Sequence, residues 1–370
     1  MGKRWFVLGV GGVFGLLGAL LVKWGNPGNM GYCAACFLRD VTGALGLHKV
    51  ATLQYLRPEI PGFILGAFIL ALYSREFRTR GGSAPLIRFI LGALMMIGAL
   101  VFLGCPLRGI LRLGGGDFNA LTGLLGFASG VGLGTYFLRN GFNLGRSRVL
   151  ANPAGGYLLP VVAGLLLALL FMKPAFIYFS AKGPGSMHAP ILISLAAGLI
   201  GGALAQRARL CLSGGFRDFF LVRDTTLLAA YGVMLLLAFL TNFALGQVKW
   251  GFFGQPIAHS AHLWNYLGLL LAGVAAVLAG GCPLRQMILA GEGNLDGAVT
   301  VLGMVAGAAL AHTYMLAGNP DTVNAAGMIV TGGPKDAGQI AVVIGILLTC
   351  AIGMFFREKL SYTKGVSIDG

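Results

Sequence analysis

Charged side chains are scarce in this 370-residue chain, where they make up 11% of the residues and only 12 are acidic. An average globular protein has about 25% charged residues, because its surface faces water. Hydrophobic residues make up 56% of this chain instead. This composition excludes an ordinary soluble protein and favours an integral membrane protein.

Motifs that bind nucleotides or metals are also missing. The chain has no G-x-x-x-x-G-K-[ST] phosphate loop and no H-E-x-x-H zinc helix, and its five histidines are scattered. The few acidic residues form no visible proton relay within the apolar runs. We therefore expect no bound metal, no cofactor and no nucleotide-driven motor, and we expect that the protein is not an enzyme.

Long apolar runs are abundant. A helix needs about 20 mostly apolar residues to cross a bilayer, and this rule predicts an all-α membrane protein with ten transmembrane helices. They lie near 5–22, 58–74, 86–104, 118–138, 155–173, 188–206, 225–246, 264–281, 297–315 and 338–356. Four further stretches are too apolar for loops but too short or too polar to span, and we expect re-entrant or half-helix segments there. These stretches lie near 27–48, 105–117, 207–223 and 282–296.

The distribution of basic residues predicts the orientation in the membrane. The net charge is +15, and most Lys and Arg residues lie in short connections, so we expect membrane lipid around the chain and no nucleic-acid partner. If the N-terminus is cytoplasmic, the cytoplasmic connections are rich in basic residues and the opposite ones have few, such as Lys182, Lys249 and Lys335. The pattern predicts a multi-pass membrane protein with both ends in the cytoplasm. The cytoplasmic set is Arg75, Arg78, Arg80, Arg88, Arg139, Arg146, Arg148, Arg207, Arg209, Arg217, Arg223, Arg357, Lys359 and Lys364.

Two segments of the chain repeat each other. The run GCPLR begins at Gly104 and again at Gly281, 177 residues later, and glycines recur at the same offset downstream. A second pattern, C-x5-R-D, begins at Cys33 and again at Cys211, 178 residues later. Two matches at nearly the same offset indicate an internal duplication.

The duplication predicts two inverted repeats. Five spans separate corresponding points, and because five is odd the second copy lies upside down relative to the first. We predict a first repeat over 1–173, a second over 174–356 and a cytoplasmic tail over 357–370. Transporters commonly place their sites near the midplane, at the interface of such repeats.

The four repeated cysteines are the main candidate residues: Cys33, Cys105, Cys211 and Cys282. Proline after Cys105 and Cys282 is typical of the first position of a helix. The cysteines then lie at helix N-termini, where free N–H groups and the helix dipole favour anions, and a thiol could contact a soft atom such as sulfur or selenium. The alternative is that each cysteine is a small side chain filling a glycine-rich contact.

Four arginines accompany these cysteines. Arg39 and Arg217 of the two C-x5-R-D segments either attract an anion or form structural ion pairs with the following aspartates, and we favour the ion pairs. Arg108 and Arg285 of the GCPLR segments lie in the first helical turn, where the dipole disfavours a cation. They indicate either an anion nearby or an anchor for a lipid headgroup. Cys36 lies outside the repeated pattern, and Cys350 is expected to serve packing alone.

With these motifs, the chain resembles the YeeE/YedE family of bacterial inner-membrane sulfur-transport proteins, over roughly 1–356. It is most similar to the YedE branch, which is associated with selenium transport. The resemblance implies an hourglass-shaped monomer in which cysteine thiols pass a sulfur-containing anion along a pore. Cys33 then stands at the outer mouth, Cys105 near the centre and Cys282 toward the inside, whereas not every member depends on a cysteine in the segment of Cys211. The family also implies a sulfurtransferase-like partner in the cytosol.

Three hypotheses of function follow. The leading one is uptake of a small sulfur or selenium anion without covalent turnover. The second is transfer of sulfur or selenium through a persulfide on a reactive cysteine, and the third is a structural or sensory membrane component. The sequence leaves open whether sulfur or selenium is carried, which ion drives transport, and what oligomer forms.

Overall fold

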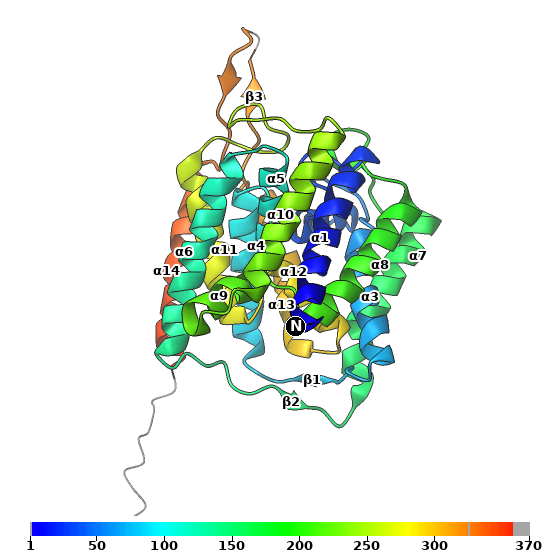
Figure 1. Cartoon of the computed structure of the whole chain (residues 1–370), viewed down its shortest axis with the longest axis vertical. Coiled ribbons are helices and arrows are strands. Elements are labelled where there is room, and N and C mark those ends of the chain that lie inside the picture. The colour runs from blue at the N-terminus through cyan, green and yellow to red at the C-terminus, as the bar shows by residue number, and fades with distance from the viewer. Residues whose placement is uncertain (1, 325, 358–370) are drawn as a thin grey trace, which may run out of the picture.

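The computed structural model describes residues 2–324 and 326–357, and these are almost entirely helical (Figure 1). The only sheets in these two ranges are two short ladders, β1 (Arg80–Gly81) with β2 (Arg148–Val149) and β3 (Thr322–Val323) with β4 (Ile329–Val330). The helices are α1 (Gly2–Lys23), α2 (Ala34–Ala44), α3 (Glu59–Tyr73), α4 (Pro85–Val101), α5 (Pro106–Gly114), α6 (Asn119–Arg139), α7 (Leu158–Met172), α8 (Ile191–Ala208), α9 (Leu212–Val222), α10 (Thr226–Ala244), α11 (His262–Ala279), α12 (Pro283–Gly291), α13 (Leu295–Thr313) and α14 (Asp336–Phe355).

The prediction of an all-α membrane protein is confirmed. Among the described residues, nine helical stretches are long and apolar enough to cross a membrane, and α3 is an apolar helix of 15 residues. Each of the ten expected spans contains one long helix. The four stretches judged too short to span contain the short helices α2, α5, α9 and α12. The tail over 358–370 lies outside the described residues.

Helices of the two halves match in sequence position. α9 begins 178 residues after α2, and α12 begins 177 residues after α5, with equal lengths within each pair. Equivalent helices of the two halves also make equivalent contacts. The contact of α1 with α10 corresponds to that of α8 with α3, and the contact of α6 with α11 corresponds to that of α13 with α4. The helices that end the two halves differ, because α7 packs on α3 whereas α14 packs on α11.

The repeated glycines make the same kind of helix contact in both halves. Gly126 and Gly130 of α6 face the backbone of α11, where a Cβ atom would overlap backbone carbonyls. Gly303 and Gly307 of α13 face the backbone of α4 in the same way. Small residues let the axes of membrane helices approach closely, so these glycines allow close packing between helices of the two halves.

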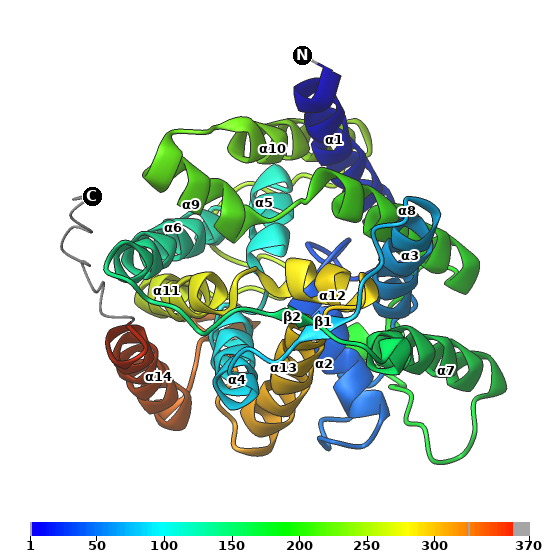
Figure 2. The same ribbon diagram turned by 90° about the horizontal axis from the view of Figure 1, so that it is seen from below.

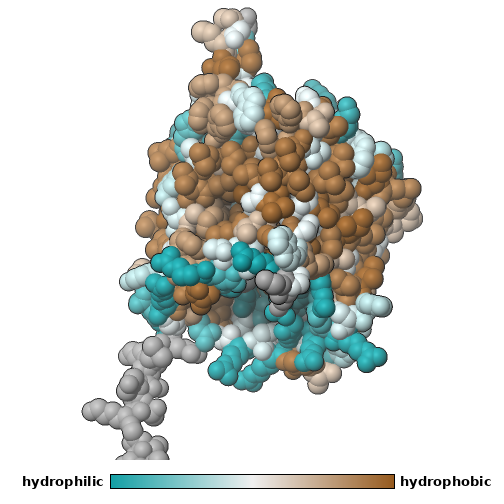
Figure 3. Space-filling model, in the orientation of Figure 1, coloured by the Kyte–Doolittle hydropathy of each residue, from teal (hydrophilic) through white to brown (hydrophobic). Residues whose placement is uncertain are grey.

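The molecule has an apolar belt and polar ends. Hydrophobic side chains cover the middle and upper part of the face in Figure 3, and hydrophilic ones gather at its lower end. The N-terminus and the β1–β2 ladder lie at the lower end in Figure 1, whereas the β3–β4 hairpin projects from the upper end. Inside the ring of long helices, Figure 2 shows the short helices α5 and α12 near the centre.

Candidate functional site

Each of the four repeated cysteines is the N-cap residue of a short helix. Cys105 precedes α5 and Cys282 precedes α12, and in both helices proline occupies the first position, as predicted. Cys33 precedes α2 and Cys211 precedes α9, which the sequence did not reveal. All four are at least 94% buried, so four helix N-termini present their free N–H groups inside the molecule.

The first cysteine pair consists of Cys33 and Cys105, whose Sγ atoms lie 3.8 Å apart. The backbone N–H of Cys36 donates to the Sγ of Cys33 at 3.1 Å, which is the cap of α2. The two thiols come from segments 72 residues apart in the chain, and they form a continuous sulfur surface at the start of α2 and α5.

Cys36 and Arg108 lie directly beside the first pair. The guanidinium of Arg108 reaches the Sγ of Cys36 at 3.4 Å. It also donates to the backbone carbonyls of Asn29 at 2.7 Å and Ile257 at 3.0 Å, and to that of Leu103. Arg108 is fully buried, so it does not reach a lipid headgroup. It fixes three loop segments around the thiols and brings a positive charge to them.

The second cysteine pair, Cys211 and Cys282, repeats this arrangement. The N–H of Gly214 donates to the Sγ of Cys211 at 3.3 Å, as Cys36 does for Cys33. The N–H of Cys282 approaches the same sulfur at 3.5 Å, and the hydroxyl of Ser213 lies 3.1 Å from it. The duplication therefore places two similar thiol pairs in one molecule.

Tyr231 of α10 is buried near thiols of both pairs. It is near enough to interact electrostatically with the thiols of Cys282, Cys211 and Cys105. The side chain is 2% exposed, and its hydroxyl has no hydrogen-bond partner among the described residues. A buried donor without a partner is costly, and an anion passing between the thiol pairs would supply one. Nothing in the sequence pattern singled out this residue.

A cavity of about 670 Å³ opens next to the second pair. We call it the Cys211 cavity. Four arginines and two aspartates line it together with Cys211, so its charge is predominantly positive. These charged residues are Arg4, Arg209, Arg217, Arg285, Asp218 and Asp224.

Two of the carboxylates near this cavity have partners. Arg285 forms an ion pair with Glu292 at 3.0 Å. The backbone N–H of Thr226 donates to Asp224, which lowers the pKa of that carboxyl, so it is ionised at neutral pH. Arg209, by contrast, has no carboxylate within ion-pair distance in the described part of the chain and remains available to an anion.

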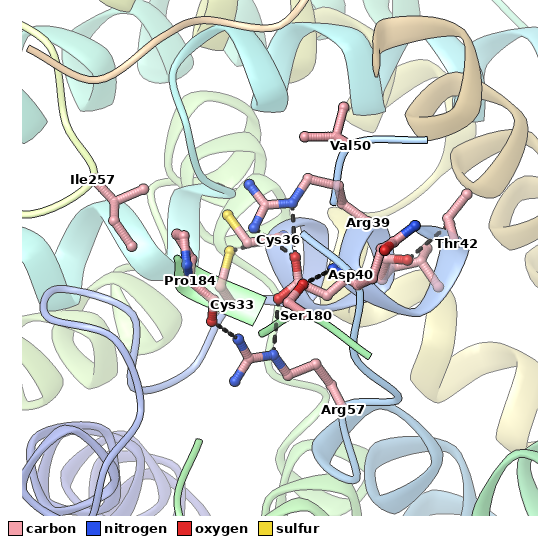
Figure 4. Close-up of polar contacts among 12 residues, drawn as sticks. Cys33, Cys36, Arg39, Asp40, Thr42, Val50, Arg57, Ser180, Pro184 and Ile257 are labelled. Atoms are coloured by element: carbon pink, nitrogen blue, oxygen red, sulfur yellow. Dashed lines mark hydrogen bonds and ion pairs between the residues drawn. The ribbon is translucent and has the colours of Figure 1, made fainter. Parts of the chain in front are cut away.

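The arginines of the C-x5-R-D segments form ion pairs, as we favoured. Arg39 pairs with Asp40 at 2.6 Å, and Arg57 pairs with the other oxygen of Asp40 at 2.8 Å (Figure 4). All three side chains are buried, and Arg57 also donates to the carbonyls of Met187 and Pro184. In the second half, Arg217 pairs with Asp218 at 2.8 Å, but both side chains are about one-third exposed.

Comparisons with known proteins find similarity to sulfur transport proteins. A family model described as "Sulphur transport" matches residues 207–366. The thiosulfate transporter TsuA of Escherichia coli (strain K12) is 34% identical over 107 residues, which cover 29% of this chain and 30% of that protein. The matched segment thus spans less than a third of the curated relative.

Proposed function

We propose that this chain is a member of the YeeE/YedE family of sulfur transport proteins, and that it carries a small sulfur or selenium anion across the bacterial inner membrane through a path lined by cysteine thiols. The observation that carries the proposal is the presence of two similar thiol pairs in one molecule. Each pair lies at helix N-termini, and each has an arginine of the same motif beside it. The agreement with transport proteins is also consistent with a chain that is not an enzyme.

The proposed architecture is two inverted repeats, over 1–173 and 174–356, with both ends of the chain in the cytoplasm. It is supported by the equivalent helix contacts of the two halves and by the two strand ladders at opposite ends of the molecule (Figure 1). The arginine-rich connections lie at the end that carries the N-terminus, which is the cytoplasmic end in this proposal.

On the outer side, the anion would enter through a cavity of about 200 Å³, which we call the Gly31 cavity. Its lining includes Asn29, Lys249 and Gln255, which offer a positive charge and amide donors, and Gly31 is two residues from Cys33. The soft terminal sulfur of a thiosulfate-like ion would then contact Cys33 and Cys105, where Arg108 offsets its charge.

From the first pair the anion would pass Tyr231 to Cys211 and Cys282 and leave through the Cys211 cavity. Each thiol offers one weak donor, and the N–H groups of the short helices add partial positive charge. Weak and repeated contacts suit conduction, because a site along a pore must also release its ion. A soft polarizable lining favours sulfur and selenium over purely oxygen-bearing anions of the same charge.

The decisive experiment is uptake into proteoliposomes that contain the purified chain. Thiosulfate, selenite and selenosulfate are offered separately, and each is compared with sulfate. Uptake of one or more of the first three above the rate for sulfate supports the proposal and names the substrate. If none of them enters faster than in empty liposomes, the proposal of transport is wrong for these anions.

The Cys211 cavity makes its own prediction. Arg209→Gln is expected to raise the half-saturating anion concentration on the cytoplasmic side about three- to fivefold at low salt, because an exposed charge contributes up to about 1 kcal/mol. The effect is expected to shrink at high salt, where screening weakens exposed charges. The measurement is efflux from proteoliposomes loaded with substrate, and the matched control is Arg207→Gln, because Arg207 already pairs with Glu76. An effect of Arg209→Gln that does not depend on salt would contradict this role.

A cytosolic partner of the sulfurtransferase type remains part of the proposal, since Arg4, close to the N-terminus, lines the Cys211 cavity. The competing function is covalent transfer through a persulfide. Protein incubated with thiosulfate and then analysed by mass spectrometry distinguishes the two, because only the covalent route leaves added sulfur on Cys33, Cys105, Cys211 or Cys282.

A further inference from the structure

Glu59, the first residue of α3, is a buried acid without a basic partner. Its side chain is inaccessible to solvent. One carboxyl oxygen accepts a hydrogen bond from the amide of Asn26 at 2.9 Å, and the other has no hydrogen-bond partner in the described residues. No Lys, Arg or His of those residues lies within 4 Å of it. Burying a carboxyl group without a counter-charge is costly, so its position here calls for an explanation beyond packing.

The charged groups around Glu59 are engaged elsewhere. On α8, which packs closely on α3, no charged residue precedes Arg207, and α7 has none. On α2, Asp40 forms ion pairs with both Arg39 and Arg57. On α12, Arg285 pairs with Glu292.

The remaining titratable neighbours are phenols and one imidazole. Tyr32 and Tyr55 both interact electrostatically with Glu59. His188 stacks on the ring of Tyr55, with 4.3 Å between ring centroids. Because a phenol is neutral at neutral pH, neither tyrosine supplies a counter-charge to Glu59.

Glu59 is linked to the anion path by short contacts. The same amide nitrogen of Asn26 that donates to Glu59 also donates to the carbonyl of Gly31 at 3.1 Å, and Gly31 lines the Gly31 cavity. Tyr32 directly precedes Cys33, and its hydroxyl donates to the carbonyl of Ala197 on α8 at 2.7 Å. Asn26 therefore connects Glu59 directly to the loop that positions the first cysteine pair.

Glu59 also lies where the two halves meet. A Cβ atom placed on Gly198 of α8 would be 2.9 Å from the backbone of Glu59, so the two helices are in close contact there. Interfaces between repeats are the surfaces that shift in alternating access. A further cavity, of about 280 Å³, is lined by Tyr55, His188 and Lys173, and Tyr55 is one of the two tyrosines that interact with Glu59.

We propose that Glu59 binds the proton that accompanies the anion, so that the protein is a proton–anion symporter; this rests on the proposed transport function. A proton from the outer side neutralises the carboxylate, the two halves close over the neutral acid, and the proton leaves to the cytoplasm after the anion. A proton fits better than a metal cation, because the amide nitrogen of Asn26 donates to one carboxyl oxygen, whereas a hard metal cation needs several oxygen ligands. An inside-negative membrane potential opposes anion entry, and co-transported protons offset that opposition.

The test uses proteoliposomes with the membrane potential clamped at zero and labelled thiosulfate as the probe. When the outside is one pH unit more acidic than the lumen, thiosulfate is expected to accumulate inside about tenfold per coupled proton, because one pH unit is a tenfold ratio of proton activity. In Glu59→Gln this accumulation is expected to vanish, while exchange of internal for external thiosulfate continues, since exchange needs no net proton movement. The matched control is Glu76→Gln, which changes a carboxylate that is 44% exposed and pairs with Arg207.

Each outcome has a distinct meaning. Exchange without accumulation in Glu59→Gln supports the proposal, whereas accumulation equal to that of the unchanged protein overturns it. The unchanged protein gives an independent test that needs no variant: thiosulfate entry must acidify the lumen, as reported by an internal pH dye, and entry without acidification also overturns it. If the unchanged protein shows no thiosulfate exchange at all, the proposed transport of thiosulfate fails instead.

Discussion

Replacement of Cys105 with alanine is expected to reduce uptake of the transported anion about 10- to 150-fold. Cys105 is the partner of Cys33, with 3.8 Å between the two sulfurs, and it begins α5 at the centre of the molecule. A hydrogen bond to a charged group contributes about 1.5–3 kcal/mol, and no neighbouring side chain replaces the lost thiol. Initial uptake rates in proteoliposomes, normalised to the amount of inserted protein, measure the effect.

The matched control for this change is Cys350→Ala. Cys350 is partly exposed on α14 and lies outside both cysteine pairs, so uptake is expected to stay within about twofold of the unchanged protein, as for most surface changes. Cys282→Ala, in the second pair, is expected to act like Cys105→Ala. Full uptake by both Cys105→Ala and Cys282→Ala would show that the anion does not pass by way of these thiols.

Replacement of Asp40 with alanine is expected to destabilise the folded protein by about 3–5 kcal/mol, the range measured when one partner of a buried ion pair is removed. Asp40 is fully buried and accepts from two arginines, Arg39 and Arg57, which are 2% and 0% exposed. The variant leaves both guanidinium groups without a counter-charge (Figure 4). The midpoint of thermal unfolding in detergent is expected to fall, with less folded protein recovered from membranes.

The chain supplies its own control for this prediction in the second copy of the motif. Asp218→Ala removes the equivalent carboxylate, but the pair of Arg217 and Asp218 is about one-third exposed. Exposed pairs contribute about 0–1 kcal/mol, so this variant is expected to unfold at nearly the same temperature as the unchanged protein. An equal loss of stability in both variants would mean that burial does not explain the effect.

The two GCPLR arginines differ in role although their motifs are identical. Arg108 is fully buried and holds three backbone carbonyls next to the first pair. Arg285 lines the Cys211 cavity and pairs with Glu292. The sequence offered either an anion partner or a lipid anchor for both residues. It did not predict that Arg108 would donate hydrogen bonds to the loops around the thiols, whereas Arg285 lines a cavity.

Local sequence was sufficient for the helices and for part of the site. Apolar runs predicted the nine helical stretches that are long enough to span and the shorter helix α3, because a membrane span needs a minimum length of apolar residues. Proline after Cys105 and Cys282 predicted the starts of α5 and α12, because proline lacks the N–H that the first helical position does not use. Neighbouring residues likewise predicted the pairs of Arg39 with Asp40 and of Arg217 with Asp218.

Other features of the site depend on segments far apart in the chain, and only the tertiary structure decided them. The contact of Cys33 with Cys105 spans 72 residues, and Arg57 completes a buried ion pair with a residue 17 positions away. Tyr231 lies near both thiol pairs because α10 packs beside α5 and α9. Within the described residues Glu59 forms no ion pair, because α8, which packs on α3, carries no charge before Arg207 and Arg57 pairs with Asp40 instead. Periodicity and motifs describe one helix at a time, whereas the environment of a buried polar group is set by all the helices packed around it.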